Sequence, residues 1–197
     1  MKKDILNRYA CTEDGKFIID ITAGKIEYLY NDFDKHAPYV RKELDQNLVD
    51  YIIECAKEIG EEKILIQFRF DEQVNAELIG RIKTSIKNYF LYLKELEILE
   101  LNQLRRRSFL FFFIGIVIMM ISVWVNDQSM IRESAIGRVF SEGLTVAAWV
   151  SLWESIAMPL ISWVPHRRQI SQYQQIADAP IQFVNAELNN SEINKAI

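Results

Sequence analysis

The chain has 197 residues and a formal net charge of −4 at pH 7. This length allows one compact domain, or a small domain together with membrane helices. The acidic balance argues against nucleic acid as the main partner, because a phosphate-binding surface needs a basic stripe. The average composition resembles that of a soluble protein, but residues 1–107 hold most of the charge and residues 108–165 hold almost none.

The N-terminal part predicts strands. Residues 17–22 and 25–30 each alternate apolar and polar side chains, and Ala23-Gly24 between them offers a two-residue turn. We therefore expect residues 17–30 to form a β-hairpin. A third strand is expected over residues 63–70, where four apolar side chains share one face: Ile64, Ile66, Phe68 and Phe70.

Two helices complete the predicted soluble part. The first has Asp45 as its N-cap and Gly60 at its C-terminal end. From Asn75 onward, a second helical stripe is formed by Leu78, Ile82, Ile86, Tyr89, Leu93 and Leu96. No glycine or proline lies between Arg81 and Ser108, so one continuous helix is expected to run on into the apolar segment. The prediction is an α+β protein with a ββαβα domain over residues 1–74 and a juxtamembrane helix over residues 75–107.

Two segments predict transmembrane helices. The first, residues 108–125, is almost purely apolar and approaches the roughly 20 residues that cross a bilayer. The second, residues 139–164, is less pure, contains three tryptophans and is expected to end at Pro165. A short loop over residues 126–138 joins the two spans into a hairpin.

Basic residues predict the orientation of this hairpin. Arg105, Arg106 and Arg107 precede the first span, and Arg167 and Arg168 follow the second. The loop holds only two arginines. By the positive-inside rule both termini are expected in the cytoplasm and the loop in the periplasm, and the basic residues are also candidates to bind anionic lipid headgroups.

After the second span, residues 165–197 are predicted to form a cytoplasmic amphipathic helix and a flexible tail. The narrow apolar stripe contains Ile170, Tyr173, Ile176 and Ala177, and it could pack back on the long helix. Pro180 is expected to end this helix, and residues 181–184 could add an edge strand.

Glu154 is the most informative residue, because a carboxylate within a membrane span is costly. It could be protonated and hydrogen-bonded across a helix interface, pair with a basic residue of another chain, or carry ions. Ser151 and Ser155 are its polar neighbours, and the three residues together form a candidate assembly site. Glu142, by contrast, is expected to be a solvated carboxylate at the outer membrane interface.

Other candidate sites are sparse. Asp20, Asp32 and Asp34 could converge on a cation, although a turn held by side-chain hydrogen bonds is the favoured interpretation. No pair among Cys11, Cys55, His36 and His166 has metal-ligand spacing. No nucleophile elbow, phosphate-binding loop or HExxH motif is present, so the sequence predicts no metal and no cofactor and favours a non-enzymatic role.

Several short stretches resemble a widespread group of bacterial two-span membrane proteins. They are Glu142-Gly143-Leu144, residues 149–154 (WVSLWE), residues 163–168 (WVPHRR), and residues 34–38 (DKHAP) followed by residues 41–44 (RKEL). The resemblance covers roughly residues 28–184. It implies a bacterial inner-membrane setting, and the group has no established activity that would imply a chemistry.

Three functions are possible, and the first of them is favoured. The first is a membrane scaffold or accessory subunit that assembles, as a homo-oligomer or in a larger complex, through its hairpin and its cytoplasmic domain. The second is a homo-oligomeric channel or ion-coupled component that uses Glu154. The third is a membrane-bound sensor or enzyme that uses the small domain.

Overall fold

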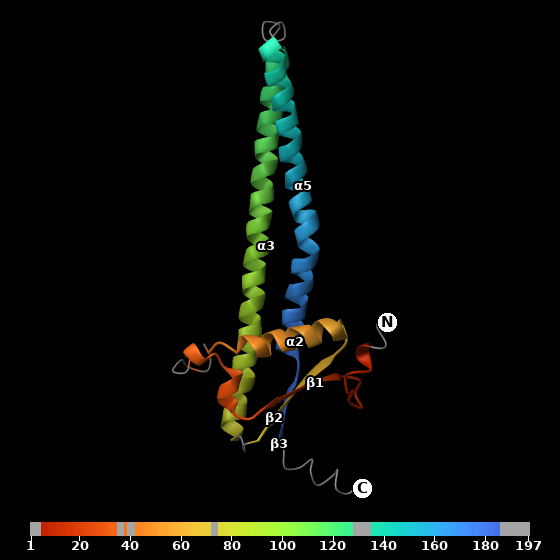
Figure 1. Cartoon of the computed structure of the whole chain (residues 1–197), viewed down its shortest axis with the longest axis vertical. Helices are drawn as coiled ribbons and strands as arrows, with labels where there is room; N and C mark the ends of the chain where they lie inside the picture. Colours follow the sequence, from red (N-terminus) through yellow and green to blue (C-terminus); the bar gives the residue numbers. More distant parts are fainter. Residues whose placement is uncertain (1–4, 35–37, 39–41, 72–74, 128–134, 186–197) are drawn as a thin grey trace. The chain divides into compact units, whose positions relative to one another are not determined.

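A computed structural model describes residues 5–34, 38, 42–71, 75–127 and 135–185. The elements follow the chain in a mixed α/β order (Figure 1). They are β1 (Phe17–Ala23), η1 (Ile26–Leu29), η2 (Asp32–Asp34), α2 (Gln46–Ile59), β2 (Ile64–Phe70), α3 (Ala76–Asp127), α5 (Ala135–Asp178) and β3 (Ile181–Asn185). The chain forms two compact units: residues 1–95 with 169–197, and residues 96–168.

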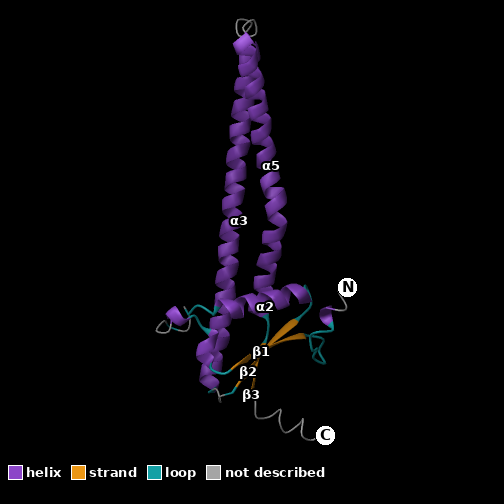
Figure 2. Cartoon of the chain, in the orientation of Figure 1, coloured by secondary structure: helices purple, strands orange, loops and turns teal. Residues whose placement is uncertain are grey.

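The first unit contains a three-stranded sheet in the order β1-β2-β3 (Figure 2). Both pairings are parallel, with Phe17 opposite Ile64 in one and Ile66 opposite Ile181 in the other. The predicted strand over residues 63–70 is confirmed as β2, which is the central strand. The predicted edge strand at residues 181–184 is confirmed as β3.

The predicted β-hairpin over residues 17–30 is wrong in its second half, so the ββαβα order is wrong as well. Its first strand exists as β1, but the next segment forms the 3₁₀ helix η1. Leu29 and Tyr30 are both buried, at 1% and 5% exposure, whereas Tyr28 is 67% exposed. Burial of two adjacent residues cannot come from a strand with one face inward, so the alternation in this segment does not reflect a sheet face.

The helix α2 is confirmed together with both of its predicted ends. The Asp45 carboxylate accepts hydrogen bonds from the backbone N–H groups of Asn47 and Leu48, at 3.0 and 3.2 Å. Gly60 follows the last turn with φ +79°, a backbone conformation that side chains other than glycine rarely adopt. These two local signals explain why the helix begins and ends where it does.

Replacing Asp45 with alanine should lower the free energy of unfolding of the first unit by about 1 kcal/mol, because two N–H groups of the first turn lose their acceptor. Denaturant unfolding monitored within this unit measures the change. Asp45→Asn is the matched control, because it keeps a side-chain oxygen and should retain most of the stability. Equal losses for both substitutions would argue against the cap.

The core of the first unit lies on one face of the sheet. Ile19, Ile66 and Phe68 of the sheet are fully buried, as are Ile82 and Ile86 of α3. The last turns of α5 add further buried residues to the same cluster: Tyr173, Ile176 and Ala177. The predicted packing of the C-terminal stripe against the long helix agrees with the 2.7 Å hydrogen bond from Lys94 Nζ on α3 to Gln174 Oε1 on α5.

The two long helices are continuous. The predicted helix from Asn75 to Val125 is confirmed as α3, which has 52 residues. The predicted end of the helix at Pro165 is wrong, because α5 runs through Pro159 and Pro165 to Asp178. The predicted end of the second membrane span at residue 164 stays a prediction. A proline inside a helix removes one backbone hydrogen bond and favours a kink. The helical turns on both sides of each proline keep their own hydrogen bonds, so the helix continues.

Candidate functional site

The second unit is an antiparallel helical hairpin made of residues 96–127 of α3 and residues 135–168 of α5. Ser122 Oγ lies 2.7 Å from Thr145 Oγ1, and these two hydroxyls join the helices by a hydrogen bond. Gly115 lies directly against Leu152: a Cβ added at Gly115 would be 2.9 Å from the Leu152 Cγ and 3.1 Å from its backbone nitrogen. These two contacts determine which residues of the helices are level with each other.

The outer surface of this hairpin is apolar. Among its exposed large side chains are Phe109, Leu110, Phe113, Val123, Trp124, Val146, Trp149, Trp153, Leu160 and Ile161. Only 22% of the most apolar 18-residue stretch of α3, and 11% of that of α5, is buried within the structure. A core helix of a soluble protein would be mostly buried, so these helices have the length, composition and exposure of helices that could cross a membrane.

The structure separates the three residues of the predicted assembly site. Glu154 is exposed on the outer surface, Ser151 is half-buried, and Ser155 is buried with its hydroxyl donating to the Leu152 carbonyl at 2.7 Å. Within the part of the chain that the structure describes, Glu154 forms no hydrogen bond or ion pair. Glu154 is therefore the residue of this set that another molecule can reach.

The register of the hairpin gives the depth of Glu154. Continuing the Gly115–Leu152 contact along both helices places Glu154 level with Phe113. Phe113 is about five residues from Ser108, the first residue of the predicted span, which corresponds to roughly 8 Å along the helix. Glu154 thus lies inside the apolar segment, on the side of Arg105. Glu142 is also exposed and lies level with Val125, at the opposite end of the same segment.

The predicted basic residues gather at one end of the hairpin and are exposed: Arg105, Arg106, Arg107, Arg167 and Arg168. Two of them contact neighbours on their own helix. Arg105 Nη2 donates to Asn102 Oδ1 at 3.0 Å, and the Arg167 guanidinium lies 5.9 Å from the centre of the Trp163 ring. The arrangement presents a positive rim next to the apolar surface.

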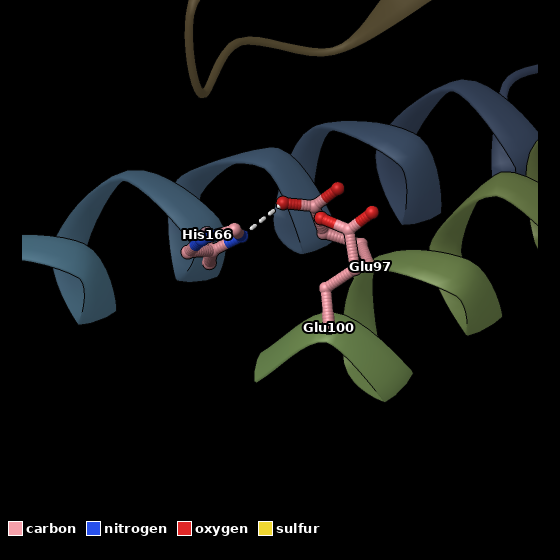
Figure 3. A group of neighbouring side chains, drawn as sticks. All are labelled: Glu97, Glu100 and His166. Carbon is pink, nitrogen blue, oxygen red and sulfur yellow. Dashed lines mark hydrogen bonds and ion pairs between the residues drawn. The ribbon is translucent and has the colours of Figure 1, made fainter. Parts of the chain in front are cut away.

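Sequence reasoning missed a cluster at the same end. Glu97 and Glu100 of α3 and His166 of α5 point toward one another, and their potential ligand atoms all lie within 4.8 Å (Figure 3). His166 Nδ1 is hydrogen-bonded to Glu97 Oε1. The available signal was the one-turn spacing of Glu97 and Glu100, but the histidine comes from a distant segment that only the hairpin register brings close.

The predicted aspartate site is not assembled among the described side chains. The Asp20 carboxylate on β1 pairs with Arg69 Nη2 on β2 at 3.1 Å. Asp32 lies in η2, and the side chain of Asp34 is outside the described part. The adjacent turn is held by Asn31, whose Oδ1 accepts from the Phe33 N–H at 3.1 Å.

A polar cavity of about 450 Å³ lies in the first unit, beside Asp20 and Arg69. Tyr9 Oη donates to Glu58 Oε2 at 2.8 Å, and Arg8 lies 3.7 Å from the same carboxylate. Burial raises the pKa of the Tyr9 hydroxyl well above its usual range, and its contacts with Cys55 and Glu58 add to the shift. The charged groups named here are paired with one another, and Glu54 and the free Cys55 thiol also line the cavity.

No family model, curated protein or solved structure matches this chain. The observations that bear on function are the exposed apolar hairpin, its exposed Glu154, and its basic end.

Proposed function

We propose that this chain is an integral membrane scaffold or accessory subunit of a bacterial inner membrane. Its two long helices cross the bilayer as a hairpin, and both termini lie in the cytoplasm. The chain assembles with further copies of itself or within a larger complex through the outer surface of the hairpin. The role is non-enzymatic, and the sheet-containing unit acts as a second contact surface.

The membrane setting is supported by the exposed apolar surface of the hairpin. Water cannot hydrate so many aromatic and aliphatic side chains without a large free-energy cost, and lipid removes that cost. The exposed tryptophans add support, because this side chain is enriched at membrane interfaces. The bacterial setting rests on the sequence resemblance alone.

The cytoplasmic position of the termini is supported by the basic rim. The arginines before the first span and after the second lie at the same end of the hairpin, since the Glu97–His166 contact joins these ends. Short loops rich in arginine and lysine stay in the cytoplasm. The predicted periplasmic loop over residues 126–138 falls largely on residues 128–134, which lie outside the described residues.

Glu154 carries the assembly proposal. Its carboxylate is exposed on the apolar outer face, about 8 Å inside the span by the register of the hairpin. Hydrocarbon offers no hydrogen-bond donor there, so a donor or a basic group from another chain would remove a cost of several kcal/mol. An intramembrane carboxylate that faces outward fits a subunit contact better than it fits a solitary hairpin.

The same residue gives the channel alternative its support, because an outward carboxylate could also face a wet lumen between several copies. The sensor or enzyme alternative would use the polar cavity of the first unit. The scaffold is preferred because a conduction path needs several polar groups along one route. Glu154 is the only acidic or basic residue of residues 143–164, and residues 108–125 contain none.

The test of the proposed function is the mass and subunit composition of the complex after gentle extraction from native membranes. A homo-oligomer or a stoichiometric complex with a second protein is expected. A chain that remains monomeric across mild detergents and lipid nanodiscs would contradict assembly. Ion flux in vesicles that is abolished by Glu154→Gln would instead favour the channel.

Glu154→Leu should shift the complex toward lower mass. Polar contacts between membrane helices contribute about 1–2 kcal/mol, so the association constant should fall roughly 5- to 30-fold per contact. Single-molecule counting or native mass spectrometry of the extracted complex measures the shift. Glu142→Leu is the matched control, because it makes the same change at an exposed glutamate at the opposite end of the apolar segment. An unchanged mass for Glu154→Leu would show that this residue is not a contact.

A further inference from the structure

Three potential metal ligands converge at the basic end of the hairpin. Glu97 and Glu100 lie one turn apart on α3, and His166 lies opposite them on α5 (Figure 3). The side chains of Glu97 and His166 are only 12% and 21% exposed. The ligand atoms of all three residues lie within 4.8 Å of one another. The group is therefore formed by two helices, with Glu97 and His166 largely shielded from solvent and Glu100 exposed.

The charges of this group are not balanced within it. Two carboxylates share the space, and only one of them, Glu97, is hydrogen-bonded to the imidazole. Glu100 forms no hydrogen bond or ion pair with any residue in the described part of the chain. Two carboxylates three residues apart on a helix repel each other. A bound cation would attract both carboxylates and offset the repulsion between them.

We propose that Glu97, Glu100 and His166 bind one divalent transition-metal ion that ties α3 to α5. Donors bound to one tetrahedral ion at about 2.0–2.2 Å are roughly 3.3–3.6 Å apart. The donors here already lie within 4.8 Å, so small side-chain rotations bring them to these separations. The ion takes the place of the direct contact between His166 and Glu97.

The donor set favours a transition metal over calcium or magnesium. Calcium and magnesium prefer oxygen ligands throughout, whereas an imidazole nitrogen with carboxylate oxygens suits zinc, iron(II) or manganese. Three protein ligands leave at least one position for water. The proposal goes beyond the proposed assembly, because the ion holds the two helices of one chain together and needs no second chain.

Zinc titration of the full chain, produced without a polyhistidine tag and stripped of metal in detergent, tests the site. One Zn²⁺ per chain is expected by calorimetry and by elemental analysis. Co²⁺ should bind at the same place, with visible absorption bands typical of nitrogen and oxygen ligands. His166→Gln should weaken Zn²⁺ binding and alter the Co²⁺ spectrum.

Glu100→Gln is the decisive variant, because it removes one ligand and leaves the Glu97–His166 hydrogen bond and the fold intact. It should weaken Zn²⁺ binding at least tenfold, since loss even of an outer-shell partner of a metal site costs 10- to 100-fold. Glu95→Gln is the matched control, because Glu95 is exposed and outside the group, and it should leave binding unchanged. No saturable binding, or equal affinity in Glu100→Gln and the unaltered chain, would overturn the proposal. A chain that binds zinc but stays monomeric would contradict only the proposed assembly.

Discussion

Replacing Phe68 with alanine should destabilise the sheet-containing unit by about 3–5 kcal/mol. The ring is fully buried in the central strand and stacks on Phe70 and Phe183, with ring centres 6.1 and 5.6 Å away. Truncation leaves a cavity that touches two strands, and a small unit has little stability in reserve. Phe68 is among the largest fully buried side chains, so its truncation should cost more than the loss of the Asp45 cap.

The rate of chemical labelling of the Cys55 thiol measures how often the core of this unit opens, and it does not depend on unfolding of the helical hairpin. It is 6% exposed and belongs to the same core, whereas Cys11 is exposed and is replaced by serine for the measurement. A loss of 3 kcal/mol should raise the rate of Cys55 labelling roughly 150-fold, if labelling follows the opened fraction of molecules. Phe33→Ala is the matched control, because that ring is 99% exposed. Equal labelling rates in the two variants would show that Phe68 does not hold the core together.

Some elements are predictable from the sequence because the signal that defines them lies within a few neighbouring residues. Asp45 and Gly60 delimit α2, because a cap and a positive φ are properties of single positions. The alternation through Phe68 predicts β2, since a central strand with one face in the core must repeat every second residue. The absence of glycine and proline between Arg81 and Ser108 predicts that α3 runs unbroken into the apolar segment.

Which strands pair, and how the long helices continue, cannot be predicted from such local signals. The segment of Leu29 and Tyr30 has the alternation of a strand, yet β1 pairs with β2, which lies far along the chain. The break expected at Pro165 is absent, because proline weakens a helix without always ending it. For Leu29 and Tyr30, tertiary packing outweighs the local pattern.

The candidate functional residues likewise divide into those predictable from local sequence and those that depend on how the helices pack. The sequence identified Glu154 and the basic residues by their place relative to the spans, and the structure shows that Glu154 is exposed whereas Ser155 is not. The group of Glu97, Glu100 and His166 was invisible, because its members come together only when α3 and α5 pair in one register. Gly115 restricts this register, because its backbone lies directly against Leu152.

Gly115→Leu should push the two helices of the hairpin apart. Even a single Cβ at this position would be 2.9–3.1 Å from three atoms of Leu152, one of them a backbone nitrogen that cannot rotate away. Inserting further carbons into a packed contact costs about 1–3 kcal/mol. Close approach through small residues is a common way for membrane helices to associate, so the loss should appear as a looser hairpin.

Disulfide formation measures this opening directly. Ser122→Cys and Thr145→Cys, in a background without the native cysteines, place two thiols where the hydroxyls lie 2.7 Å apart. Gly115→Leu should slow their oxidation roughly 5- to 150-fold, the range that corresponds to about 1–3 kcal/mol. Gly143→Leu is the matched control, since a Cβ there meets no atom within 4 Å. Unchanged oxidation in the Gly115 variant would mean that the contact with Leu152 does not set the register, and the depth of Glu154 and the pairing of Glu97 with His166 would then need another cause.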